Sequence, residues 1–214
     1  MTIGKIPAQT FSYALHPLLM TFYCVGLLFT YTTFYEIYYR SIFIILFTII
    51  IFSVVIPCTF VILLKKLGFI EKISSITRRE KVLPYFMVVF SNCMMIYYFY
   101  YTANMSFWFL GLLAAPTLSL LIGAIINLFW KISAHMIGMG SLIGSTFSIC
   151  ANVKGLNPFV LFIILFILAG CLGVSRLYLK QNTPAQVYAG FILGITVSFL
   201  TVWGSLIIVL SKWI

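Results

Sequence analysis

The chain has 214 residues, of which 63% are hydrophobic and only 7% are charged, and its formal net charge at pH 7 is +10. A soluble domain of this length carries about a quarter charged residues. Helices that are apolar on every side need either a very large protein core or surrounding lipid, and this chain is too short to build the first. The composition therefore predicts an integral membrane protein, and we expect no nucleic acid as a partner.

Seven apolar runs approach or exceed the length of a membrane-spanning helix, which is roughly 17–25 residues. The fifth run is the weakest because it is short and rich in glycine and serine, so six spans is the alternative. We predict an all-α fold, a polytopic bundle of seven transmembrane helices that forms a single membrane domain over residues 1–214. The runs are Leu15–Phe34, Ile42–Leu64, Val82–Tyr101, Phe107–Leu128, Met136–Ala151, Pro158–Val174 and Val187–Leu210.

Small residues and cysteines inside the runs favour packing over chemistry. Gly140 and Gly144, and likewise Gly190 and Gly194, are spaced so that two helices can approach closely. The five cysteines are odd in number and far apart, and no spacing suits a disulfide framework or a metal site. We expect them to be buried thiols that pack as small hydrophobic side chains, and we expect no metal.

The connections between the runs fall on two faces of the predicted bundle, and positive charge gathers on one of them. Of the thirteen basic residues, ten lie on the first face, and the other three are Arg40, Lys154 and Lys212. The positive-inside rule would place the basic face in the cytoplasm. Face A receives the N-terminus, 65–81, the turn around 131 and 176–185; face B receives 36–41, 103–106, 152–157 and the C-terminus.

Helices that begin on face A could form an anion site there. Free N–H groups and the positive end of the helix dipole meet basic side chains at such helix starts, and this combination suits phosphate. One helix is expected to begin at Ser133, and another at Thr183, where Thr183 suits the N-cap and Pro184 the first helical position. His135 adds a group that titrates near neutrality, whereas His16 is expected to be an interfacial residue at the mouth of the first span.

Three segments on face A resemble, in order and in spacing, the motifs of the type 2 phosphatidic acid phosphatase superfamily, which includes the vanadium haloperoxidases. "SAH" at Ser133–His135 resembles the PSGH motif, and "SRLYLKQNTPAQVYAG" from Ser175 resembles SRxxxxxHxxxD. "KISSITRREKVLP" from Lys72 resembles KxxxxxxRP. The resemblance implies a lipid-phosphatase-like core over residues 72–210.

The resemblance also implies roles for individual residues in the hydrolysis of a phosphomonoester or pyrophosphate without metal or cofactor. His135 would protonate the leaving oxygen. Cationic and hydroxyl side chains would neutralise the phosphate and stabilise charge on its oxygens. Lys131 lies outside the motifs and is added because it stands beside Ser133. The predicted phosphate-binding residues are Lys72, Arg79, Lys131, Ser133 and Arg176.

The catalytic pair departs from the superfamily pattern. Asn182 stands at the position of the nucleophilic histidine, and Gln186 stands at that of the aspartate which orients it. An amide nitrogen is conjugated with its carbonyl and cannot form the covalent phosphoenzyme. Three explanations are open: the protein binds without hydrolysing, an asparagine has replaced a natural histidine to trap a ligand, or another nucleophile such as Tyr178 serves.

We therefore expect an integral membrane lipid-phosphatase-like protein that binds the phosphate head of an anionic lipid, of the phosphatidate, prenyl pyrophosphate or lipid A type. The alternative is a non-enzymatic subunit of a larger membrane complex, with other membrane subunits as partners. The expected location is the cytoplasmic (inner) membrane of a bacterium. The resemblance places face A on its outer side, where such lipid phosphates are exposed, and we follow the resemblance over the charge count.

Overall fold

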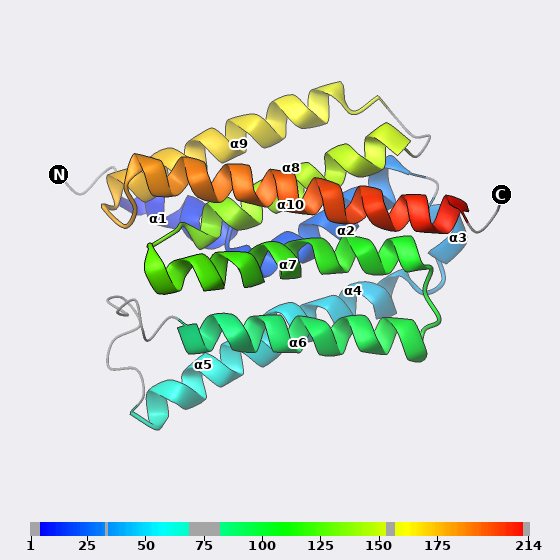
Figure 1. The fold of residues 1–214 in the computed structure, drawn as a ribbon, viewed down its shortest axis with the longest axis horizontal. Coiled ribbons are helices and arrows are strands. Elements are labelled where there is room, and N and C mark those ends of the chain that lie inside the picture. Colours follow the sequence, from blue (N-terminus) through cyan, green and yellow to red (C-terminus); the bar gives the residue numbers. More distant parts are fainter. Residues whose placement is uncertain (1–4, 33, 69–81, 153–156, 212–214) are drawn as a thin grey trace.

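The computed structural model describes residues 5–32, 34–68, 82–152 and 157–211, and every element along them is helical (Figure 1). The all-α prediction is confirmed. The elements are α1 (Lys5–Ala14), the 3-10 helix η1 (Pro17–Leu19), α2 (Met20–Tyr31), α3 (Phe34–Tyr38), α4 (Ile42–Ile50), the π-helix η2 (Ile51–Val55), α5 (Ile56–Lys66), α6 (Val82–Tyr101), α7 (Phe107–Phe129), α8 (Ala134–Asn152), α9 (Phe159–Tyr178) and α10 (Pro184–Ser211).

Six helical segments in the described part of the chain are long and apolar enough to cross a membrane. Helix α6 is formed but is not one of the six, so the predicted number of seven spans is not confirmed. The expected weakest run is among them, as α8. The six segments are Ile6–Tyr31, Ile42–Lys66, Phe107–Phe129, Ala134–Asn152, Phe159–Tyr178 and Pro184–Val209.

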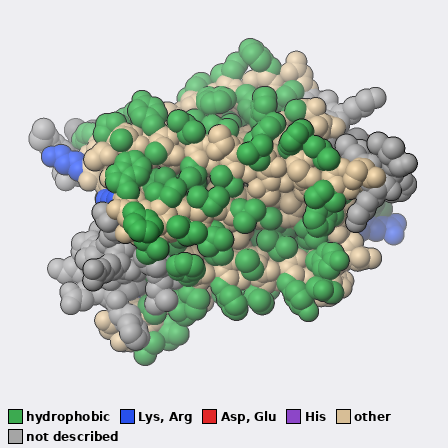
Figure 2. All heavy atoms as spheres, viewed as in Figure 1, with side chains coloured by type: hydrophobic (Ala, Val, Ile, Leu, Met, Phe, Trp, Pro, Cys, Tyr) green, Lys and Arg blue, Asp and Glu red, His purple; other side chains and the backbone are tan. Residues whose placement is uncertain are grey.

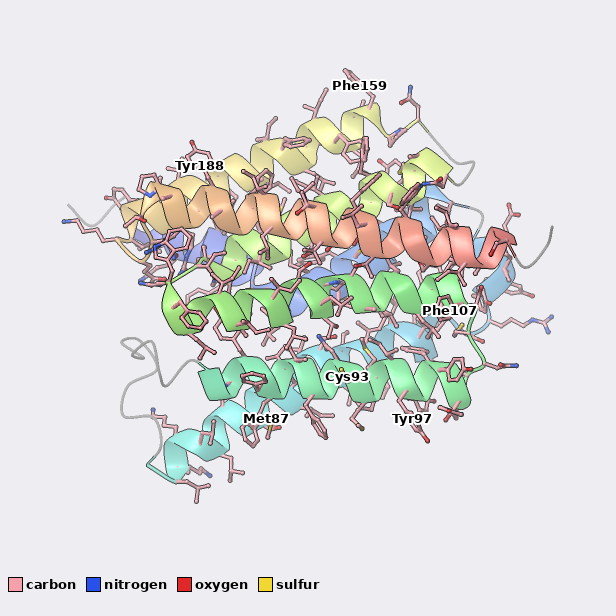
Figure 3. The ribbon with its side chains drawn as sticks, in the orientation of Figure 1. Met87, Cys93, Tyr97, Phe107, Phe159 and Tyr188 are labelled. Carbon is pink, nitrogen blue, oxygen red and sulfur yellow. The ribbon has the colours of Figure 1, made fainter. Side chains whose placement is uncertain are left out.

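The outer surface of the bundle is apolar along its flank. Figure 2 shows hydrophobic side chains spread over this flank, while lysine and arginine are visible only near its two ends. Tyr97 and Phe159 are 59% and 68% exposed and point away from the bundle (Figure 3). Such a surface suits contact with lipid. Cys58, Cys93 and Cys171 are exposed as well, so the expectation that the thiols are buried is wrong for these three.

The two predicted faces correspond to the two ends of the bundle. Helix α1, the end of α5, the start of α6 and the α7–α8 and α9–α10 connections lie at one end, on the left of Figure 1. Helix α3, the α6–α7 connection and the end of α10 lie at the other end. For the described residues, the division into face A and face B is therefore confirmed.

The centre of the bundle is a close contact between α8 and α10. A methyl group on Gly140 would overlap the carbonyl oxygen of Phe191, and one on Gly144 would overlap that of Ile195. A methyl group on Gly190 would lie 2.8 Å from the carbonyl oxygen of Ser133. These positions need glycine because backbone meets backbone there. The predicted close approach is confirmed, and we call Gly140, Gly144, Gly190 and Gly194 the glycine seam.

Helix α8 owes its central place to its small and polar residues. Its most apolar window has a mean hydropathy of only 1.2, yet 72% of that window is buried, against 28% for Ile42–Lys66 with a mean hydropathy of 2.8. Glycines and serines let neighbouring helices approach, and those helices then shield the hydroxyl groups from lipid. The run that is least suited to lipid is thus the one most covered by protein, and it carries His135 at its start.

Candidate anion-binding site

The turn after α9 places Arg176 beside the start of α10. The Lys180 N–H donates to the Leu177 carbonyl at 2.9 Å, and the Gln181 N–H donates to the Arg176 carbonyl at 3.2 Å. Lys180 has a positive φ, in the left-handed region. The turn therefore has the hydrogen bonds and the left-handed residue of a Schellman cap. This cap stops α9 and reverses the chain within a few residues, which brings Asn182 back to the Arg176 side chain.

The start of α10 fixes Asn182 from the other side. The Gln186 side-chain oxygen accepts the Thr183 N–H at 3.1 Å and the Asn182 amide at 3.3 Å. The Val187 N–H donates to the Thr183 carbonyl at 3.1 Å, which makes Thr183 the N-cap of a helix that begins with Pro184, as predicted. Gln186 acts as the third helical residue of a capping box. The resemblance implies that Gln186 orients the side chain four residues before it, and a hydrogen bond between Asn182 and Gln186 is found there.

Arg176 is half-buried and joins three segments of the chain. Its Nε donates to the Asn182 side-chain oxygen at 3.3 Å, and its Nη1 donates to the Ser12 hydroxyl of α1 at 2.8 Å. His16 and Tyr85 lie close enough to interact with the guanidinium electrostatically. The guanidinium is therefore held in one orientation, and the two oxygens that accept these bonds are both neutral.

His135 reaches the same residue of α1 from α8. Its Nε2 lies 3.2 Å from the Ser12 carbonyl oxygen. Because a carbonyl only accepts, Nε2 carries the hydrogen. The His16 ring stands edge-on to the His135 ring, with centroids 5.2 Å apart, and its Nδ1 accepts the Leu18 N–H. His16, which was expected to be interfacial, lies against His135.

These side chains form one group, which we call the Ser12 cluster: Ser12, His16, His135, Arg176 and Asn182. Ser12 and Tyr85 were missed in the sequence, because Ser12 precedes every apolar run. The available signal was the spacing of Ala8, Ser12 and Leu15, which lie on one face of a helix. All three of these side chains are buried.

The remaining predicted residues lie near the cluster or outside the described chain. The Lys131 ammonium donates to the Gln181 carbonyl at 2.6 Å, so it joins the α7–α8 and α9–α10 connections. Ser133 is 1% exposed, and its hydroxyl has no hydrogen-bond partner among the described residues. The Ser133 N–H donates to the Gln186 carbonyl at 3.4 Å, which places Ser133 against α10. Lys72 and Arg79 lie outside the described residues.

The charge around the Ser12 cluster favours an anion. Within the described ranges the side-chain carboxylate is that of Glu36, in α3 at the opposite end of the bundle. Arg176, Lys131 and the N-termini of α8 and α10 therefore face no described carboxylate at their own end. A guanidinium with two helix N-termini binds phosphate through charge-assisted hydrogen bonds.

The fold and the site define a class: a helical membrane protein with a cationic, histidine-containing cluster at one end of its bundle. No protein-family model, curated protein or solved structure matches the chain.

Proposed function

We propose that the protein binds the phosphate head of an anionic lipid at face A, as a lipid-phosphatase-like protein of the type 2 phosphatidic acid phosphatase kind. The main support is that Arg176 and His135, which the resemblance assigns to phosphate binding and to the leaving group, both contact Ser12. The buried hydroxyl of Ser133, which has no hydrogen-bond partner among the described residues, adds a further donor at the adjoining start of α8.

Binding without hydrolysis is the form of this function that the site supports. Asn182 uses both ends of its amide, accepting from Arg176 and donating to Gln186. Neither amide atom is a nucleophile that could form a covalent phosphoenzyme. Tyr178, the other nucleophile considered, has a side chain that is 51% exposed, and it lies in the last turn of α9. The cluster therefore retains groups for recognition, and the residue at the superfamily's nucleophile position cannot supply the covalent step.

The proposed setting is the inner membrane of a bacterium, with seven spans and with face A on the outer side. Helix α6 extends from Val82 to Tyr101. A helix of this length matches the thickness of the hydrocarbon core. It runs alongside α7 in the opposite direction, as a seventh span would (Figure 1). The outer placement of face A rests on the resemblance.

The alternative, a subunit of a larger complex, gains no support from the glycine pairs. The Gly140/Gly144 and Gly190/Gly194 pairs could have served a partner chain, but they pack against each other within this chain. The glycine seam therefore leaves no close-packing motif of that kind exposed in the described helices.

The test is binding of dioctanoyl phosphatidate to the purified protein in mild detergent, measured by titration calorimetry. Dioctanoyl phosphatidylcholine, which has the same chains and no phosphomonoester, is the control ligand. Arg176→Gln should weaken phosphatidate binding at least tenfold, because it removes a charge-assisted bond. Arg40→Gln, at the other end of the bundle, should leave it unchanged. Equal binding of both lipids, or full binding by Arg176→Gln, would contradict the proposal.

A further inference from the structure

Ser12 of α1 forms hydrogen bonds with Arg176 and His135, the two side chains that would bind a phosphate. Ser12 is 7% exposed; its hydroxyl oxygen accepts from Arg176 at 2.8 Å, and its carbonyl oxygen faces His135 Nε2 at 3.2 Å. Two oxygens of a single residue therefore take up one donor of the guanidinium and one donor of the imidazole. A phosphate likewise has oxygens on one phosphorus atom that can accept hydrogen bonds from the guanidinium and from the imidazole.

Ser12 and a bound phosphate cannot use these donors together. A backbone carbonyl has no hydrogen to donate, and its partial negative charge would repel a phosphate oxygen placed beside it. A phosphate that accepts from His135 Nε2 must therefore displace the Ser12 carbonyl, and with it this part of α1.

Helix α1 has features that allow it to separate from α9 and the Ser12 cluster. It has 10 residues and is followed by a break at His16 and Pro17, where α2 has not yet begun. Its buried face consists of Ala8 and Ser12, while Ile6 and Tyr13 are 69% and 74% exposed. A helix of this length is marginal without packing partners. Its order therefore depends on contacts with α9 and with the Ser12 cluster.

We propose that α1 is a gate over the anion site. Ser12 holds Arg176 and His135 while the site is empty, and a phosphomonoester displaces it. This inference rests on the proposed function and adds a regulatory step to it: whatever holds α1 against α9 lowers the affinity for the lipid phosphate, and whatever releases α1 raises it.

The first test is the Ser12→Ala variant, titrated with inorganic phosphate and with dioctanoyl phosphatidate. Removing the hydroxyl removes the Arg176 bond of the closed state, so affinity should rise about tenfold. Thr10→Ala is the matched control, because the Thr10 hydroxyl bonds to Ile6 within the exposed side of α1. A gain with both ligands identifies the phosphate group as the displacing agent, and a gain with phosphatidate alone identifies the lipid headgroup; either supports the gate.

Two results would overturn the gate. Unchanged affinity in Ser12→Ala would show that the Ser12 bond does not compete with the ligand. Weaker affinity would show that the Ser12 hydroxyl is itself a ligand of the phosphate and that α1 stays in place.

The second test uses the unmodified protein and needs no variant. Amide hydrogen exchange in residues 5–14 should become faster when dioctanoyl phosphatidate saturates the site, because the released helix loses its packing. Dioctanoyl phosphatidylcholine should leave the exchange unchanged. Slower exchange with phosphatidate would mean that the ligand orders α1, and the gate would be wrong.

The two proposals fail in different ways. If phosphatidate binds, Arg176→Gln weakens binding at least tenfold, and neither the Ser12 variant nor α1 exchange responds, the gate is wrong and the proposed function stands. If neither the unmodified chain nor Ser12→Ala binds phosphatidate or inorganic phosphate, both proposals are wrong.

Discussion

Two helix pairs meet at the Ser12 cluster, and they are held together in opposite ways. Helices α8 and α10 contact each other backbone to backbone along the glycine seam, with no room for a methyl group at Gly140, Gly144 or Gly194. Helix α1 contacts α9 with a narrow buried face and with the polar bonds of Ser12. The first contact is a matter of shape, and the second depends on hydrogen bonds that a ligand can replace.

This difference assigns different tasks to the two sides of the site. The side formed by α8 and α10 positions His135, Ser133 and Asn182 with little freedom, because neither helix can shift without backbone overlap. The side formed by α1 has low local stability, which is the property that mobile elements over binding sites share. A rigid side and a replaceable side give a site that is pre-formed and can also be closed.

The largest expected effect comes from a double substitution that tests how well the start of α10 positions residues 182 and 186. Asn182→His with Gln186→Asp should produce phosphatase activity about a thousandfold or more above the unmodified chain. The reason is that a nucleophile and its orienting carboxylate then stand where α10 already fixes a hydrogen-bonded pair. Release of inorganic phosphate from dioctanoyl phosphatidate is the measurement, with a chelator present.

Two companion variants set the limits of that experiment. His135→Ala in the same background should lower the rate by about 10²–10⁴-fold, because the leaving-group acid is lost. Asn182→Gln, which keeps an amide, should stay inactive. Activity in the unmodified chain would show that position 182 is not the nucleophile, and no gain in the double variant would favour a purely binding role.

A smaller effect is expected from a single methyl group in the glycine seam. Gly144→Ala should destabilise the protein by about 1–3 kcal/mol or more, because the methyl group meets the backbone of Ile195. Gly204→Ala is the matched control in α10, where nothing lies within 4 Å of the added carbon. This control should stabilise the protein by about 0.5–1 kcal/mol. Thermal unfolding in detergent should shift in opposite directions; equal shifts would contradict the seam.

The smallest expected effect concerns α1 alone. The Tyr23 hydroxyl donates to the Ala14 carbonyl at 2.9 Å and so fastens the end of α1 to α2. Tyr23→Phe should change overall stability by less than about 0.5 kcal/mol but speed amide exchange in residues 5–14 by about two- to fivefold. Loss of overall stability without faster exchange in α1 would mean that α1 belongs to the core.

Features encoded locally could be predicted from the sequence, and contacts between distant residues could not. Thr183 and Pro184 are adjacent, and the helix start that they form followed from residue type and position. The glycine pairs predicted a close approach for the same reason. The contact of Ser12 with Arg176 joins residues 164 positions apart, and no local pattern specifies it.

The differences between the predicted apolar runs and the observed helices have a similar physical cause. Hydropathy measures the free energy that an apolar run gains on transfer into lipid. It does not include the polar groups that a neighbouring helix can shield from lipid. Helix α8 was underestimated because its polar groups are enclosed by protein. Helix α1 was missed because "KIPAQTFSYA" is not apolar enough to stand out, and it forms against α9 instead.

The central position of α8 also bears on how the chain is made. With a mean hydropathy of 1.2, and with hydroxyl groups of Ser141 and Ser148 that lack hydrogen-bond partners among the described residues, α8 is the span of these six with least to gain from lipid alone. Its glycine-lined partner, α10, leaves the ribosome only after α9 has been made. A chain interrupted before residue 184 would therefore hold an unpartnered polar helix in the membrane, where quality-control proteases could recognise it. The binding site is completed in the same late step of biosynthesis.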